Sequence, residues 1–243
     1  MRTRRQRLTV RVLVVAGLVV GGCWALTTQA STRQGINFQV STHQVPLYVK
    51  AVDFLHRHYQ YDLLAHEVTD GMPIDQQRAL AIFAWTRQRI RPTPQGWPIM
   101  DDHILHIIIR GHGLEDQVAD VFTTLCAYAG VPAFWRIIKT PGTERNLILS
   151  FARVEGRWAV FDVANGFVFT DRTGVLVSKE ALAADPALVR LTAGEFQYGG
   201  GPYARYFSTL ASLEAPRTLR AQLQMPGPRL WYELGRVIGW KEG

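Results

Sequence analysis

The sequence has very little cysteine. Only Cys23 and Cys126 occur in its 243 residues. Small secreted scaffolds held by disulfides need several cysteine pairs, so that class of protein is excluded. Cys23 lies in an apolar N-terminal run, and Cys126 lies in a segment that we expect to be a buried helix. We therefore expect no disulfide in the folded region, whose stability must come from its apolar core.

The sequence also lacks the motifs of common cofactor-dependent and hydrolytic enzymes. It contains no P-loop, no dinucleotide-binding glycine pattern and no G-x-S-x-G elbow. Histidine is confined to the first half of the chain, where the last of the seven is His112. We predict no cofactor, and any catalytic histidine would have to come from the first half.

Acidic residues are missing from the first thirty positions, although the whole chain has a net charge of +7. Five arginines fall in that stretch, and they leave 22 Lys and Arg against 20 Asp and Glu in the remainder. The basic character therefore belongs mostly to the N-terminus. A nucleic-acid-binding protein would carry its positive charge on the folded domain, so we expect no nucleic-acid partner.

The N-terminal segment has the pattern of an export signal. Its arginines precede an apolar run at residues 12–26, which is the length of a signal-peptide core and short for a membrane span. Three outcomes fit residues 1–30: cleavage near Ala30, an uncleaved anchor held by residues 8–28, or a lipoprotein modified at Cys23. Each places the remainder in the cell envelope, on the extracytoplasmic side of the inner membrane, because the arginines stay inside.

The rest of the chain predicts a linker, one domain and a C-terminal extension. Residues 31–46 are polar and predict an irregular linker, residues 47–195 form the domain, and residues 196–243 form the extension. Within the domain, periodicity and turn residues predict helices and strands in an α+β order. The expected helices are 49–61, 75–90, 114–129 and 178–183, the expected strands are 133–139, 146–154, 158–163, 167–170 and 174–177, and residues 104–109 fit a strand or a short helix.

The extension ends in a possible amphipathic helix. Between residue 228 and the end of the chain, five apolar residues fall on one helical face, namely Leu230, Trp231, Leu234, Val237 and Ile238. This face either packs on the protein's own domain or contacts the membrane surface or a protein partner.

One segment resembles the nucleophile helix of the transglutaminase-like, papain-like cysteine protease superfamily. There a Gly-x-Gly turn leads into the catalytic cysteine, and the helix ends at Gly-Val-Pro-Ala or a close variant. Here the turn is Gly-His-Gly at residues 111–113, Glu115 holds the cysteine position, Gln117 and Ala119 follow, and Gly-Val-Pro-Ala stands at residues 130–133. The resemblance implies a buried helix packed on an antiparallel sheet.

The resemblance also implies the positions of a Cys-His-Asp triad, and two of its three residues are replaced. The histidine position falls on Asn146, at the start of an expected strand, and the aspartate position falls on Asp162, after Gly-Arg-Trp at residues 156–158. Cys126 lies three helical turns beyond Glu115 and is expected to be a buried core residue. The resemblance thus implies a degenerate triad of Glu115, Asn146 and Asp162.

Two functions follow from these replacements. The first is a membrane-tethered pseudoenzyme that binds or scaffolds a protein partner, possible ligand-binding residues being Glu115, Gln117 and Asp162. Domains that resemble it accompany envelope polysaccharide or peptide assembly. The alternative is a hydrolase or transferase that uses the carboxylates of Glu115 and Asp162, because neighbouring carboxylates can raise one pKa and permit proton transfer.

One group of histidines and acidic residues fits either a metal site or histidines in turns and on the surface. Three histidines and two acids lie close together in sequence, namely His103, His106, His112, Glu115 and Asp116. Their spacing matches no zinc motif, and the glycines at 111 and 113 interrupt it. We therefore expect no metal, with the histidines in turns and on the surface.

Overall fold

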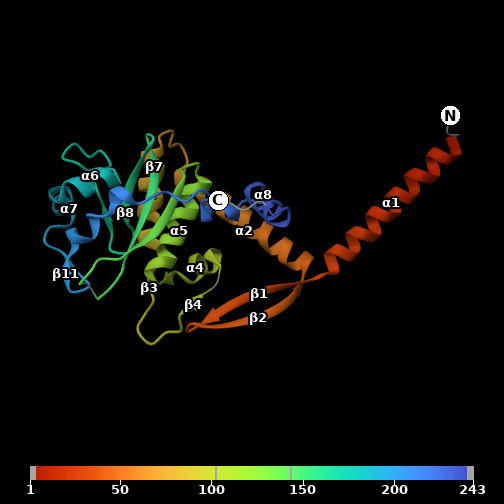
Figure 1. Ribbon diagram of the computed structural model, residues 1–243, viewed down its shortest axis with the longest axis horizontal. Helices are drawn as coiled ribbons and strands as arrows, with labels where there is room; N and C mark the ends of the chain where they lie inside the picture. Colours follow the sequence, from red (N-terminus) through yellow and green to blue (C-terminus); the bar gives the residue numbers. More distant parts are fainter. Residues whose placement is uncertain (1–3, 102, 143, 240–243) are drawn as a thin grey trace.

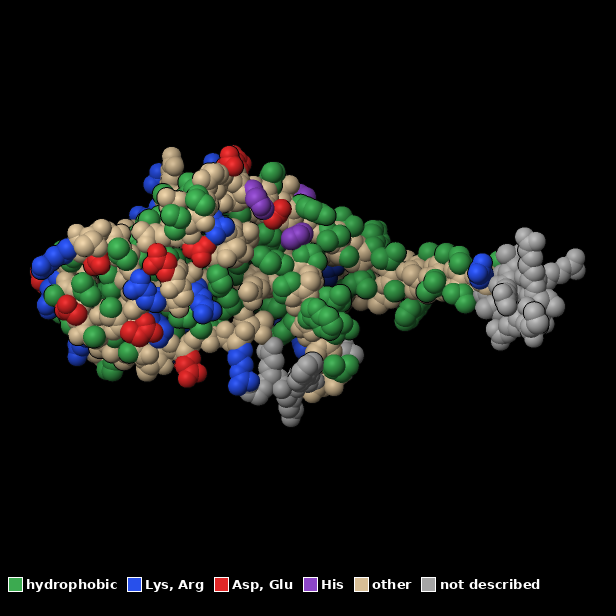
Figure 2. Space-filling view, turned by 90° about the horizontal axis from the view of Figure 1, so that it is seen from above, with side chains coloured by type: hydrophobic (Ala, Val, Ile, Leu, Met, Phe, Trp, Pro, Cys, Tyr) green, Lys and Arg blue, Asp and Glu red, His purple; other side chains and the backbone are tan. Residues whose placement is uncertain are grey.

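A computed structural model describes residues 4–101, 103–142 and 144–239. Its first helix, α1 (Arg4–Thr27), projects away from the folded domain (Figure 1). Apolar side chains cover the face of α1 seen in Figure 2, and the large ones are solvent-exposed. Within the described ranges, no helix is both long enough and apolar enough to cross a membrane.

The expected irregular linker at residues 31–46 is wrong, because most of it forms a β-hairpin. Strand β1 (Gln29–Ile36) pairs antiparallel with β2 (Gln39–Pro46), and β1 also pairs with β4 (Met100–Asp101) at the edge of the domain. The two-residue turn holds Asn37 and Phe38, both at positive φ, as a tight hairpin requires. Most side chains of both strands are exposed, so the sequence lacks the alternation of apolar and polar residues that predicts a strand.

Four helices then build the first half of the domain. They are α2 (Leu47–Thr69), α3 (Asp75–Arg89), α4 (Ile104–Arg110) and α5 (Glu115–Tyr128). The short segment at 104–109 is thus a helix, and α2 extends beyond the expected helix at 49–61. Helix α5 is buried over nearly its whole length and follows the short strand β5 (His112–Gly113), which pairs in parallel with β3 (Arg91–Pro92).

A four-stranded antiparallel sheet packs against α5 and confirms the α+β class. Its order is β6 (Ala133–Ile138), β7 (Leu147–Val154), β8 (Arg157–Asp162) and β9 (Phe167–Val168), so each strand pairs with its neighbour in sequence. Val131 and Ala133 are fully buried where the chain leaves α5 for β6. The papain-like order of helix followed by strands is therefore present.

The sheet separates two apolar cores. One core joins α2, α3, α4 and α5 to one face of the sheet. The other covers the opposite face with α6 (Lys179–Ala184), α7 (Pro186–Ala193) and the chain beyond them. That chain contains β10 (Gln197–Tyr198), β11 (Gly201–Pro202) and two short 3₁₀ helices, η1 (Tyr203–Phe207) and η2 (Leu210–Ser212). A further short 3₁₀ helix, η3 (Arg220–Gln224), lies beside α5.

Much of the expected extension beyond residue 195 therefore lies inside the domain. Tyr198, Tyr203, Tyr206 and Leu210 belong to the same buried cluster as Phe151 of the central strand β7. Aromatic residues supply seven of the sixteen buried residues of this cluster, and their rings bury large areas with few residues. The fold needs this part of the chain to cover the second face of the sheet.

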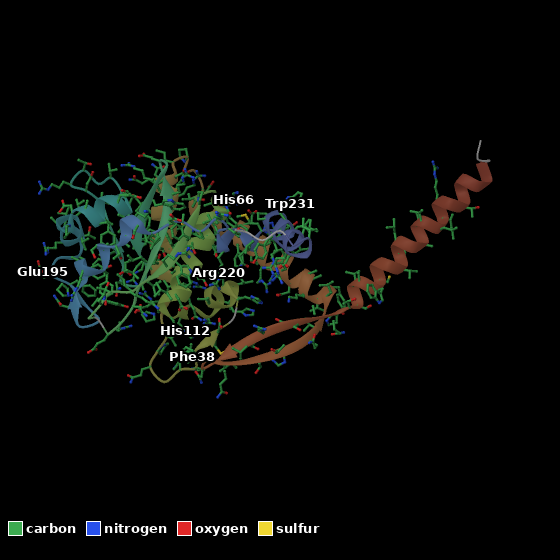
Figure 3. The ribbon with its side chains drawn as sticks, viewed as in Figure 1. Phe38, His66, His112, Glu195, Arg220 and Trp231 are labelled. Atoms are coloured by element: carbon green, nitrogen blue, oxygen red, sulfur yellow. The ribbon has the colours of Figure 1, made fainter. Side chains whose placement is uncertain are left out.

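The last helix, α8 (Pro226–Val237), leaves its apolar face open. Leu230, Trp231, Leu234 and Ile238 are all exposed, Trp231 by 75%. Trp231 lies on the side of the domain from which α1 projects (Figure 3). Of the two alternatives for this face, packing on its own domain is therefore wrong for these four residues; the side chain of Val237 lies outside the described part.

Candidate site at the triad positions

The start of α5 is fixed by the side chain of Gln117. Its Oε1 accepts hydrogen bonds from the backbone N–H of Leu114 at 3.1 Å and from Nη2 of Arg110 at 2.9 Å. Its Nε2 donates to the carbonyl oxygen of Met100 in β4. A Cβ atom at Gly113 would lie 3.0 Å from Gln117 Oε1, which explains the glycine. Gln117 was predicted to bind a ligand, but both the oxygen and the nitrogen of its side-chain amide form hydrogen bonds within the domain.

Glu115 occupies the first turn of α5, where the helix N-terminus favours a carboxylate. Its Oε1 lies 2.9 Å from Nη2 of Arg145, and its Oε2 accepts a hydrogen bond of 2.7 Å from the hydroxyl of Tyr198. The side chain is 31% exposed, and the guanidinium of Arg145 lies over the Tyr198 ring at 5.2 Å. Both carboxylate oxygens of Glu115 are therefore bound to other parts of the fold.

Asn146 lies immediately before β7 and is exposed. Its backbone carbonyl is 3.3 Å from the hydroxyl of Tyr198, so this tyrosine connects two of the three triad positions. Burial, together with the neighbouring Glu115 carboxylate, raises the pKa of Tyr198 well above its usual range. The tyrosine therefore stays protonated at neutral pH and donates its hydrogen bond to Glu115.

Asp162 ends β8 and is completely buried. Its carboxylate accepts hydrogen bonds from the backbone N–H of Asn165 at 2.9 Å, from the side-chain amide of Asn165 at 2.8 Å, and from the hydroxyl of Tyr203. Burial raises the pKa of Asp162, the nearby Glu115 adds to the rise, and the hydrogen bonds oppose it. Every donor here belongs to the fold and is neutral.

The two tyrosines link these environments into one network. The rings of Tyr198 and Tyr203 have centroids 6.5 Å apart, and the hydroxyl of Tyr206 donates to the carbonyl of Arg145 at 2.7 Å. A Cβ atom at Gly199, which has a φ of +55°, would lie 2.6 Å from that hydroxyl. The absence of a side chain at Gly199 thus lets the Tyr206 hydroxyl reach the carbonyl of Arg145.

Sequence reasoning missed these tyrosines. Residues 199–201 are three glycines, a composition typical of a flexible segment, yet Tyr198, Tyr203 and Tyr206 lie on both sides of them and are buried. The usable signal was the concentration of tyrosine around glycines, because buried tyrosines need both close packing and a polar partner. Their partners could not have been named, since they lie 83 and 41 residues away in the chain.

Cys126 cannot supply the missing nucleophile. It is completely buried, as predicted, and burial raises the pKa of its thiol well above the usual range. A catalytic thiol needs a low pKa and access to substrate. Cys126 is a core residue.

The histidines near α4 do not assemble a metal site in the part of the chain that the structure describes. His112 packs its ring edge to face on Trp97 at 5.1 Å, and the rings of His103 and His106 are 5.9 Å apart. In the described ranges, no group of three or more His, Cys, Asp or Glu side chains is arranged to hold a metal ion. Asp102, which precedes them, lies outside the described residues.

Comparisons with known proteins give partial similarity only. No family model and no curated protein matches the chain. Among solved structures, a candidate protease from Parabacteroides distasonis is similar over 55% of this chain and 35% of its own, with 11% identity and a TM-score of 0.35. A candidate cysteine protease from Cytophaga hutchinsonii is similar over 52% of this chain and 45% of its own, with 16% identity and a TM-score of 0.38.

In both comparisons the chain spans less than half of the solved protein. Each neighbour is named for protease activity, one of them for cysteine protease activity. The chain is thus similar over about half of its length to candidate proteases, and the interpretation of its site rests on the side-chain geometry described above.

Proposed function

We propose that this protein is a non-catalytic member of the transglutaminase-like group, which acts as a binding or scaffolding component. One observation carries the proposal: the carboxylates at the cysteine and aspartate positions are both hydrogen-bonded to tyrosines of the same domain. A thiol protease needs a thiolate, a base and an orienting group that are free to act on substrate. Here all three roles have been replaced or used for packing.

The alternative, a hydrolase or transferase that uses Glu115 and Asp162, requires one carboxyl group to exchange protons with a substrate. Asp162 is completely buried beneath Tyr203 and would have to lose that contact first. Glu115 is more accessible, but Arg145 and Tyr198 occupy its two oxygens. The same geometry therefore supports binding over catalysis.

We also propose that the protein acts in the cell envelope, held at the extracytoplasmic side of the inner membrane through residues 8–28. The support is the export-type sequence, with arginines before an apolar run, and the exposed apolar side chains of α1. An accessory role in envelope polysaccharide or peptide assembly follows from the resemblance alone. Alkaline extraction of membranes tests the attachment: full-length protein should stay in the pellet and a chain lacking residues 1–28 should not.

The catalytic question is tested by two variants, Glu115→Gln and Asp162→Asn, each measured for biological activity and for melting temperature. A scaffold tolerates Glu115→Gln, and any loss in Asp162→Asn accompanies a lower melting temperature. Loss of activity at an unchanged melting temperature would support the carboxylate enzyme instead. A thiol-reactive protease probe adds a control: in Cys23→Ser protein the remaining Cys126 should stay unlabelled until the protein unfolds.

A further inference from the structure

Among the described residues, one edge of the four-stranded sheet has no neighbouring strand. The order β6-β7-β8-β9 leaves β6 outermost, and β6 is six residues long. Over the residues that the structure describes, β6 makes backbone hydrogen bonds to β7 alone. An open edge of this length is a template for pairing with another extended chain.

The register shows which backbone groups point outward from β6. The N–H of Arg153 donates to the carbonyl of Pro132 at 2.8 Å, which places a hydrogen-bonded pair just before the strand. Such pairs alternate with non-hydrogen-bonded pairs along an antiparallel ladder. The outward N–H and C=O groups of β6 therefore belong to three residues, namely Ala133, Trp135 and Ile137.

A groove of about 400 Å³ runs along this edge. Its walls come from β6, from α5 and from the chain at residues 216–221. Asp120 of α5 joins these walls, because it accepts a hydrogen bond of 2.6 Å from Nε1 of Trp135 and lies 3.2 Å from Nη2 of Arg220. Arg220 lies beside α5 (Figure 3). The groove is thus fixed in shape by bonds across it.

The side chains along the edge differ between the two faces of the strand. Trp135 and Ile137 lie on the α5 face, and Ile137 is 49% exposed. Arg136 lies on the other face, with its guanidinium 5.4 Å from the centre of the Phe134 ring. An added strand would place alternate side chains against an apolar surface on the α5 face and against the Arg136 cation on the other face.

We propose that the β6 edge and this groove bind an extended segment of a partner protein in which apolar and acidic residues alternate. Backbone hydrogen bonds to the outward groups would give affinity, and the alternation of Trp135, Arg136 and Ile137 would give sequence preference. The groove contains none of the triad positions. Peptide binding at this edge therefore does not depend on whether Glu115 and Asp162 are catalytic.

The test is binding of a labelled hexapeptide to the full-length protein in detergent, followed by fluorescence polarisation. The probe is N-acetylated and alternates valine with glutamate; the control peptide replaces each glutamate with lysine. We expect saturable binding of the glutamate peptide and weaker binding of the lysine peptide. No saturable binding of the glutamate peptide would overturn the proposal.

Two substitutions at one position separate pairing from packing. Ile137→Pro removes an outward N–H and leaves the bonds between β6 and β7 in place, which edge strands tolerate. It should weaken binding of the glutamate peptide about 10-fold or more, since one hydrogen bond and the approach of the added strand are lost. The matched control Ile137→Val keeps the N–H and should bind as the unaltered protein does. Equal affinity of Ile137→Pro and Ile137→Val, at similar melting temperatures, would contradict strand pairing.

Charge reversal at Arg136 gives a readout that misfolding cannot produce. Arg136→Glu should reverse the order of the two peptides, because the cation on that face becomes an anion. An unchanged preference would overturn the assigned chemistry. If sedimentation instead reveals a dimer of this chain that Ile137→Pro dissociates, and neither peptide binds, the occupant is a second copy and the partner proposal is wrong.

Discussion

Glu115 and Asp162 stand at two positions of the same triad pattern, yet their surroundings differ. Glu115 is partly exposed and faces the guanidinium of Arg145, which is itself 63% exposed. Asp162 is completely buried and meets only neutral donors. Exposed ion pairs contribute little to stability, whereas breaking a buried hydrogen-bonded group is costly. The comparison predicts that the fold depends more on Asp162 than on Glu115.

The largest effect should come from Asp162→Ala. The change leaves the buried hydroxyl of Tyr203 and the half-buried amide groups of Asn165 without their acceptor. We expect a loss of about 3 kcal/mol in the free energy of unfolding. Urea denaturation measures it, and a loss below about 1 kcal/mol would contradict a structural role for Asp162.

The next effect concerns pH. Because burial raises the pKa of Asp162, the folded protein binds this proton more tightly than the unfolded chain does. Stability should therefore fall as pH rises from the ordinary aspartate pKa of 3.8 through the raised value in the folded protein. Asp162→Asn removes the titrating group, so its stability relative to the unaltered protein should improve over the same rise.

Denaturation of both proteins at matched pH values isolates this term. Asp120, whose pKa burial also raises, is present in both and cancels in the difference. A difference that does not vary with pH, or that changes in the opposite direction, would reject the raised pKa.

A smaller effect is expected for Tyr203→Phe. It removes one hydroxyl that donates to Asp162 and keeps the ring that packs on Phe169 and Phe207. The loss of one hydrogen bond to a buried carboxylate should cost about 1.5–3 kcal/mol, less than removing the carboxylate. A cost equal to that of Asp162→Ala would mean that Tyr203 carries the whole effect.

The smallest effect is expected at Glu115. Glu115→Gln keeps an acceptor for Tyr198 and weakens the pair with the exposed Arg145. The free energy of unfolding should change by less than about 1 kcal/mol. A larger change would show that Glu115 contributes as much to the free energy of unfolding as Asp162 does, and would contradict the difference proposed between the two residues.

The sequence predicted the helix and the sheet of this region because their signals are local. The apolar stripe of α5 is followed by Gly130 and Pro132, and three strands with clear turns come next. Burial of Cys126 followed from the same stripe. Periodicity and turn residues are sufficient for such elements, because neighbouring residues determine them.

The hydrogen-bond partners of Glu115 and Asp162 could not be predicted from the sequence, because the folded topology brings them together. Tyr198 and Tyr203 belong to the core on the face of the sheet opposite α5, and they follow α6 and α7 in the chain. The hairpin at β1 and β2 was missed for the opposite reason, since most of its side chains are exposed and it has no apolar face to detect. The first failure concerns long-range packing and the second concerns the absence of a local pattern.

The bond between Tyr203 and Asp162 is central to the proposed structural role of Asp162, and a double-mutant cycle tests it directly. The unfolding free energies of Tyr203→Phe, Asp162→Ala and the double variant are compared with that of the unaltered protein. We predict a coupling energy of at least about 1 kcal/mol, because the two side chains are in contact and buried. Additivity within about 0.5 kcal/mol would show that the tyrosine does not hold the carboxylate and would contradict the proposed structural role of the triad positions.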